Sequence, residues 1–290
     1  AAALLVARSG PPKNEGEARA RLAARRPAPA DLNVVVVTLD TLRADRLGCY
    51  GGPAGISPAV DALAAEGVLF ERATAQSSWT KPSMVSVLSG LLGTEHGVRE
   101  REPAIPEAVE TLARRFAAAG YRSAAFTANA YLTRGAGFDR GFETFEFAHL
   151  DAQTVTRRAI EWLRGRDDGR PAFLWVHTVD PHAPYEPREP FRSRWAPGVP
   201  AGVGSFAHVR SLGGRPAEET APFVPQYRAL YDAEVAQNDA AFGELLDALR
   251  ATGRSDGACV VLASDHGEGL WEHGVNGHGW DLFEEVLHVP

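Results

Sequence analysis

The chain contains the stretch Asn33-Val34-Val35-Val36-Val37-Thr38-Leu39, a continuous apolar and β-branched run that ends at an acidic residue, Asp40. Runs of this kind are typical of central parallel strands whose two faces are both covered by helices. A second run, Ala258-Cys259-Val260-Val261-Leu262-Ala263, has the same character and leads into Ser264-Asp265-His266. We therefore expect two buried strands that each deliver a carboxylate to the edge at which open α/β sheets place their chemistry.

Helix-like and strand-like segments alternate between these two runs. The predicted helices run from Ser57-Pro58 to Gly67 and over residues 107–119, 154–164 and 226–250, and the other predicted strands cover 68–70, 121–127 and 172–176. Alternation of this kind predicts an α/β fold with a mostly parallel central sheet and helices on both faces. The segment 186–222 is weakly patterned and rich in Pro, Gly and Arg, so we expect a functional loop or lid there that selects the substrate.

The composition describes an ordinary globular protein. The chain has 290 residues, is 44% hydrophobic, and can bury the core of one large α/β domain. Its net charge of −7 is mild and there is no basic stripe, so nucleic acid is not expected as a partner. Cys49 and Cys259 lie far apart in apolar surroundings, and we expect both to be core thiols rather than a disulfide.

The two ends of the sequence differ from the middle. Residues 1–7 are apolar and residues 8–30 are rich in Arg, Ala and Pro, so residues 1–31 are predicted to be a linker or the remnant of a signal or anchor segment. Such a segment would allow membrane association and place the protein outside the cytoplasm, in the periplasm or anchored to a membrane. An apolar strand is expected to begin near His288-Val289-Pro290, so the domain over 32–290 is predicted to be incomplete at its carboxyl end.

Several polar residues fall at the predicted ends of strands and helices. Each has an ordinary explanation by itself, because Asp and Thr often cap helices and loop histidines often face solvent. Their convergence at one edge of a sheet is what predicts a metal-dependent hydrolytic site. The residues are Asp40, Thr80, His182, Asp265, His266 and His278.

Thr80 is placed by the helix signals around it. Pro82 falls in the first turn of a predicted helix and Gly90 follows its end. Thr80 therefore lies at a helix amino terminus, where free N–H groups and a partial positive charge favour an anionic ester. The simpler alternative is that Thr80 only caps the helix.

The segment 80–90 resembles the sulfatase signature C-x-P-S-R-x-x-x-L-T-G. Thr80 stands at the Cys position, Pro82 and Ser83 are kept, and Met84 replaces Arg. Further matching segments occur in the same order, and the resemblance covers residues 32–290. These segments are 39–51, 119–122, 180–185 and 264–268. The chain is similar to the catalytic portion of the sulfatase branch of the alkaline phosphatase superfamily.

The resemblance implies roles for the converging residues. Asp40, Asp265 and His266 would bind one divalent metal together with Thr80, and His182 and His278 would contact the oxygens or leaving group of the ester, or hold a second metal. The family implies calcium, whereas the imidazole ligands favour Zn or Mn as the alternative.

The departures from the signature narrow the expected chemistry. Sulfatases convert Cys or Ser at this position to formylglycine, and Thr80 cannot be converted in that way, so no formylglycine is expected. Asp40 is followed by Thr41 rather than by a second acidic residue, and His278 stands where many sulfatases have Lys. A threonine at the nucleophile position and a single acidic residue after the first strand resemble the pattern of phosphoethanolamine transferases, lipoteichoic acid synthases and nucleotide phosphodiesterases of the same superfamily.

Two further residues are predicted to contact the substrate: Lys81, which follows Thr80, and Asn129, which lies at the end of a predicted strand. Four other residues are predicted to be structural, namely His96, His177, Glu234 and Asp239.

Three functions follow as hypotheses. The first is hydrolysis of sulfate or phosphate esters through a Thr80 nucleophile, with a small anionic ester or a sulfated or phosphorylated glycan or lipid as substrate. The second is a phosphoethanolamine or glycerophosphate-type transferase, or a phosphodiesterase, with the same site. The third is a non-catalytic binding domain, which the presence of tightly bound metal would argue against.

Overall fold

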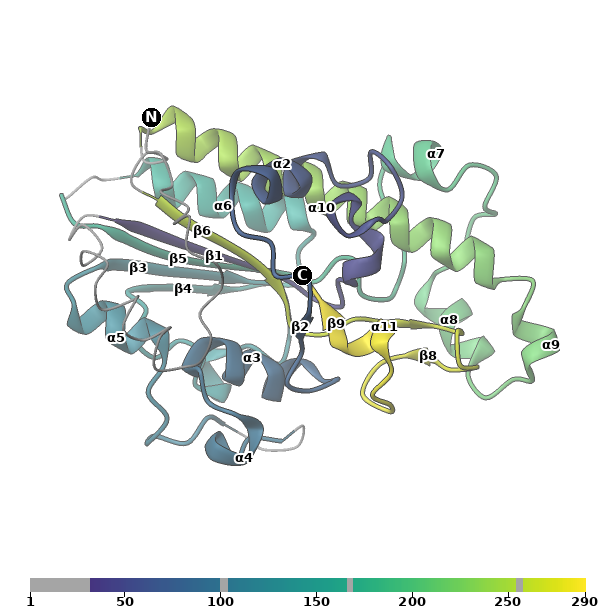
Figure 1. Ribbon diagram of the computed structural model, residues 1–290, viewed down its shortest axis with the longest axis horizontal. Helices are drawn as coiled ribbons and strands as arrows, with labels where there is room; N and C mark the ends of the chain where they lie inside the picture. Colours follow the sequence, from purple (N-terminus) through teal and green to yellow (C-terminus); the bar gives the residue numbers. More distant parts are fainter. Residues whose placement is uncertain (1–31, 100–103, 166–168, 254–257) are drawn as a thin grey trace, which may run out of the picture.

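The computed structural model describes residues 32–99, 104–165, 169–253 and 258–290, and the predicted amino-terminal linker lies outside them. Its centre is a five-stranded sheet in the order β4-β3-β5-β1-β6, and all neighbouring strands are parallel (Figure 1). The strands are β1 (Asn33–Leu39), β3 (Arg122–Thr127), β4 (Thr144–Phe147), β5 (Ala172–Thr178) and β6 (Ala258–Ser264). The predicted parallel α/β sheet is confirmed.

Helices cover both faces of this sheet, as predicted. Figure 1 shows α2, α6 and α10 on one face and α3 and α5 on the other. Their bounds are α2 (Pro58–Glu66), α3 (Thr80–Ser89), α4 (Gly93–His96), α5 (Leu112–Ala118), α6 (Ala152–Arg164) and α10 (Val224–Ala251). Because side chains alternate along a strand, β1 supplies both cores: Val35 and Val37 pack under α6 and α10, whereas Val36 packs on the side of α3 and α5.

Two predictions of local structure are wrong. Residues 68–70 form no strand, and Val68 and Phe70 are 68% and 69% exposed, because no described strand pairs with this short apolar run. The next strand is instead β2 (Ala73–Thr74), which pairs antiparallel with β9 (His288–Val289). The helix predicted over 107–119 begins only at Leu112, because Thr111 is its N-cap and accepts a hydrogen bond from the Arg114 amide.

The last strand of the central sheet, β6, is less buried than predicted. Within the described ranges it pairs only with β1 and forms one edge of the sheet, so Cys259 is exposed and Val261 is 42% exposed. Cys49 is partly buried. The prediction that both cysteines are core thiols is therefore wrong, since an apolar run does not distinguish a central strand from an edge strand.

The predicted loop over 186–222 contains three short helices, α7 (Phe191–Trp195), α8 (Phe206–Leu212) and α9 (Ala217–Thr220). They lie alongside the half of α10 that extends beyond the sheet (Figure 1). The chain then ends with β7 (Gly269–Leu270), β8 (Asn276–Gly277), α11 (Glu284–Leu287) and β9. Within the described ranges, no helix has both the length and the apolar character that crossing a membrane requires.

Candidate active site

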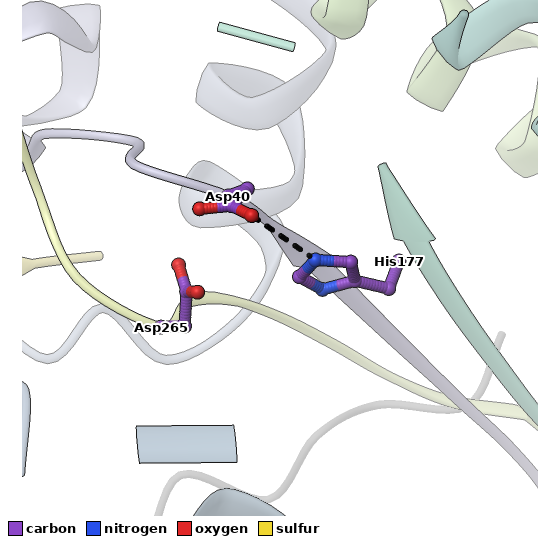
Figure 2. Close-up of side chains that lie close together, drawn as sticks. All are labelled: Asp40, His177 and Asp265. Atoms are coloured by element: carbon purple, nitrogen blue, oxygen red, sulfur yellow. Dashed lines mark ion pairs between the residues drawn. The ribbon is translucent and has the colours of Figure 1, made fainter. Parts of the chain in front are cut away.

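The register of the sheet brings three side chains together. Strand β1 lies between β5 and β6, and Leu39 is aligned with both Thr178 and Ser264. Asp40 and Asp265, each one residue further along, therefore emerge at the same level of the sheet. His177 on β5 lies beside them, and Figure 2 shows the three side chains meeting between the strand ends.

These three side chains have the properties of a metal site. Each is fully buried, and each offers one ligand atom that lies within 4.8 Å of the ligand atoms of the other two. Nε2 of His177 is 3.6 Å from Oδ2 of Asp40. Among the residues that the structure describes, Asp40 Oδ1, Asp265 Oδ2 and His177 Nε2 have no hydrogen-bond partner, although buried polar atoms are rarely left without one. Oxygen and imidazole donors left open at one buried point fit a divalent cation.

His266 completes this cluster and connects it to Thr80. Its Nδ1 donates to the carbonyl oxygen of Gly267 at 2.9 Å, so the lone pair in the neutral ring is on Nε2. That Nε2 lies 3.4 Å from Oδ2 of Asp265 and 3.7 Å from Oδ1 of Asp40. The hydroxyl oxygen of Thr80, the first residue of α3, is 3.2 Å from the same nitrogen. With His177, five residues from four distant segments of the chain thus lie together: Asp40, Thr80, His177 and the adjacent pair Asp265 and His266.

The pKa values of the two carboxylates, Asp40 and Asp265, are shifted in opposite directions. Burial and the neighbouring charge of Asp40 raise the pKa of Asp265 to about 7. Burial also acts to raise the pKa of Asp40, but the close contact with His177 and the electrostatic attraction of the neighbouring histidines outweigh it and lower the pKa. Burial and the charge of His278 lower the pKa of His266 to about 4, which leaves its ring neutral. A neutral imidazole and two close carboxylates are the protonation states that a bound cation would favour.

Backbone strain marks the same place. Thr41 has a positive φ of 59°, which is an unfavourable conformation for a β-branched residue. It is held there because its amide donates to Oδ1 of Asp265 at 3.2 Å and its carbonyl accepts from the Tyr231 hydroxyl at 2.6 Å. The strained turn directs Asp40 and Asp265 toward the same point.

Two further histidines lie next to this cluster. The ring centroid of His278 is 4.3 Å from that of His266 and 5.0 Å from that of His182. His278 Nδ1 is 2.9 Å from Oε1 of the buried Glu268. Burial opposes the charged ring, but the charge and the hydrogen bond of Glu268 raise the pKa of His278 to about 9. His278 is therefore a cation at neutral pH, with its Nε2–H free of the Glu268 contact.

The two predicted substrate contacts have different surroundings. Asn129 donates through Nδ2 to Oδ2 of Asp40 and accepts from the Tyr131 amide at 2.8 Å, so both ends of its amide are engaged by the protein. Lys81 follows Thr80, is 8% exposed, and places its ammonium 5.7 Å from the ring centroid of Tyr131. The Tyr131 ring also packs against Trp79. Trp79 and Lys81, the two sequence neighbours of Thr80, therefore both contact the Tyr131 ring.

Sequence reasoning missed His177. It lies inside a strand, where a histidine is most often a structural residue, and its Nδ1 does contact Thr38 Oγ1 at 2.8 Å. The signal that could have identified it is register: His177 is one position before the end of β5 and is aligned with Thr38, two residues before Asp40, so the side chains of His177 and Asp40 lie on the same face of the sheet. Asp239 and Glu234 are structural as predicted, since they accept backbone amides of Val60 and Glu186.

Comparison with known proteins identifies the family. The sulfatase family model matches residues 32–290, and the chain therefore belongs to the sulfatase family. The chain is 26% identical to human iduronate 2-sulfatase over 89% of its own length and 58% of that protein. It spans less than two thirds of the first curated relatives that it matches.

Solved structures share the fold. The phosphonate monoester hydrolase of Agrobacterium radiobacter superposes with a TM-score of 0.73 and 22% identity, over 89% of this chain and 67% of that one. The periplasmic domain of EcEptC from Escherichia coli, solved in complex with Zn, superposes with a TM-score of 0.66 and 20% identity, over 90% and 71%. Sulfatases, a phosphonate hydrolase and EcEptC thus share one architecture with this chain.

Proposed function

We propose that this chain is the catalytic part of a metal-dependent enzyme that cleaves phosphoric or sulfuric esters through Thr80. The observation that carries the proposal is that Nε2 of His266 lies beside the Thr80 hydroxyl and also beside the open carboxylate oxygens Oδ1 of Asp40 and Oδ2 of Asp265. A buried hydroxyl beside open ligand atoms supports an enzyme over a binding module, because ester transfer to a hydroxyl uses this arrangement.

Asp40, Asp265, His266 and Thr80 would hold the metal, and His177 is a further donor on the same side. Such a cation would neutralise the ester and lower the pKa of the Thr80 hydroxyl. The position of Thr80 at the start of α3 adds the positive end of the helix dipole. Calcium is the family expectation, and the imidazole donors make Zn or Mn the alternative.

The proposed reaction has two steps. The Thr80 oxygen, its proton lost to solvent, bonds to the phosphorus or sulfur atom while the bond to the leaving oxygen breaks. The Nε2–H of His278, or the Nε2–H of a protonated His182, delivers a proton to that oxygen. A water oxygen then bonds to the same centre while the bond from that centre to the Thr80 oxygen breaks. The water proton passes to the histidine that gave up its proton, the phosphoric or sulfuric product leaves, and Thr80 is regenerated. Transfer to an acceptor hydroxyl in place of water would give the transferase, which uses the same residues.

The substrate is proposed to be a small anionic ester, or a sulfated or phosphorylated glycan or lipid. Lys81 is proposed to contact the anion, while Asn129 would hold Asp40 and could also reach the ester. A site outside the cytoplasm is proposed, which the periplasmic origin of the EcEptC domain supports by analogy.

The test is turnover of an aryl phosphodiester, an aryl phosphonate and an aryl sulfate by metal-loaded protein, each measured beside Thr80→Ala. Phosphoester or phosphonate turnover that disappears in the variant supports threonine-based phosphoryl transfer. Turnover that survives the substitution means that Thr80 is not the nucleophile.

A further inference from the structure

We infer that Tyr185 is a positioning residue that joins the two histidines of the leaving-group side into one hydrogen-bonded unit. The inference rests on the proposed function, since it concerns how His182 and His278 are held beside the ester. Tyr185 lies three residues after His182, on the loop that follows β5.

The first part of the unit is a buried chain of hydrogen bonds. The Tyr185 hydroxyl donates to Oε2 of Glu268 at 3.1 Å, and Oε1 of Glu268 is 2.9 Å from Nδ1 of His278. Tyr185 is fully buried and Glu268 is 1% exposed, so water does not compete for these oxygens. Because each carboxylate oxygen has its own donor, Glu268 is fixed in one orientation and in turn fixes the imidazole plane of His278.

The second part is the anchoring of the loop itself. One side chain of α10, Asn238, accepts from the Thr178 hydroxyl at 3.1 Å and donates to the carbonyl oxygen of Asp180. On the other side of His182, the amide of Glu186 donates to Oε1 of Glu234 at 2.6 Å. His182 is therefore held between two points fixed to one face of a long helix, and Tyr185 extends from that rigid loop to Glu268.

The consequence is a shared placement of the two imidazoles. Their ring centroids are 5.0 Å apart, yet His182 and His278 come from segments nearly 100 residues apart in the sequence. Loss of the Tyr185 hydroxyl leaves Oε2 of Glu268 without a donor and lets the carboxylate rotate. His278 would then lose its orientation toward the leaving oxygen, while Thr80 and the carboxylates at the metal site would be untouched.

A purely structural role for Tyr185 is the competing explanation, since it packs in a cluster of aromatic rings. Tyr227 provides the matched control. It is also fully buried, its ring contacts that of Tyr185 at 5.5 Å, and its hydroxyl lies 2.7 Å from His208 Nδ1 rather than near Glu268. Tyr227→Phe thus removes a buried hydroxyl from the same cluster without breaking the chain to His278.

The kinetic test uses metal-loaded protein and methyl aryl phosphodiesters whose phenols differ in acidity. Protonation or hydrogen bonding of the leaving oxygen matters most for poor leaving groups. We expect Tyr185→Phe to lower kcat about 10- to 100-fold for the least acidic phenol and less than about threefold for nitrophenol, with KM nearly unchanged. Tyr227→Phe should leave both values near wild type. Glu268→Gln should reproduce the steeper dependence, and adding Tyr185→Phe to it should cost little more.

A second measurement does not depend on turnover. In protein labelled with ¹⁵N-histidine, the Nδ1 proton resonance of His278, assigned with His278→Gln, should shift in Tyr185→Phe and stay in place in Tyr227→Phe. An unchanged resonance, or equal loss for all leaving groups, would overturn the inference and leave the proposed function standing. A wild-type protein without turnover would overturn the proposed function, and the shift would still report whether Tyr185 positions His278.

Discussion

Replacing Asp265 with asparagine should change the free energy of unfolding in opposite directions in the absence and in the presence of a divalent metal. In the metal-free protein, burial and the charge of Asp40 raise the pKa of Asp265 from 3.8 to about 7. The folded state therefore binds a proton between these values that the unfolded state has lost, so stability falls as the pH rises through this window. At about 1.4 kcal/mol per pH unit, ionised Asp265 costs the fold up to about 4 kcal/mol near pH 8.

Asparagine removes this cost with little change in shape. Its carbonyl oxygen can still accept from the amides of Thr41 and His266, which lie 3.2 and 2.9 Å from Oδ1 of Asp265. Its NH₂ group would replace Oδ2, which is 3.4 Å from the His266 Nε2 lone pair, and could donate to it. With chelator present, Asp265→Asn should thus be as stable as the wild type near pH 4 and more stable near pH 8.

Metal should reverse this order. A cation at about 10⁴ times its Kd stabilises the folded state by about 5.5 kcal/mol, which exceeds the ionisation cost of about 4 kcal/mol and raises Tm by about 10–20 °C for a domain of this size. Asp265→Asn removes a ligand and should lose most of this shift.

The assay is thermal and urea unfolding from about pH 4 to pH 8, with chelator and with Ca, Mn or Zn, beside Asp247→Asn as a surface control. Asp247 is exposed and lies on α10. A metal-free Asp265→Asn protein less stable than the wild type at pH 8, or equal metal shifts in both proteins, would refute the reasoning.

Three further predictions follow from individual contacts. Thr80→Ser should retain turnover of an aryl phosphodiester while Thr80→Ala loses about 10³-fold or more in kcat; comparable loss in both would argue that Thr80 is structural. Because the pKa of His278 is raised to about 9, kcat should fall as the pH rises through that value, and a His278→Gln protein with the same alkaline limb would contradict the assignment. Asp239→Ala should cost about 1–2 kcal/mol in urea unfolding, because both carboxylate oxygens accept amides in the first turn of α2. Asp247→Ala should change stability by less than about 0.5 kcal/mol, and an equal loss in the two variants would show that the cap is not stabilising.

The central sheet could be predicted because the sequences of its strands are clear apolar, β-branched runs. The apolar run before Asp40 and the one before Asp265 specify parallel strands, and the signals around Thr80 specify the start of α3. The order of the strands across the sheet could not be predicted from the sequence. The edge position of β6, and with it the exposure of Cys259, depends on which strands pair, and no local pattern encodes that.

Some residues of the candidate site could likewise be predicted from the sequence, and others could not. Residues that follow a strand, such as Asp40 and Asp265, could be selected from sequence because strand ends are where such folds place polar groups. His177 could not be selected in this way, because only the pairing of β5 with β1, which aligns His177 with Thr38, brings this histidine within reach of Asp40. The role proposed for Tyr185 could not be predicted either, because its hydroxyl donates to Glu268, which lies 83 residues away in the sequence.

The most direct test of the account is to trap the covalent intermediate. Metal-loaded protein would be mixed with an aryl phosphodiester, quenched in acid within the first turnover, digested and mapped by mass spectrometry. The account predicts a phosphoryl ester on the peptide that contains Thr80, located on Thr80 itself and absent from Thr80→Ala. Turnover with no such adduct, or an adduct on another residue, would contradict it.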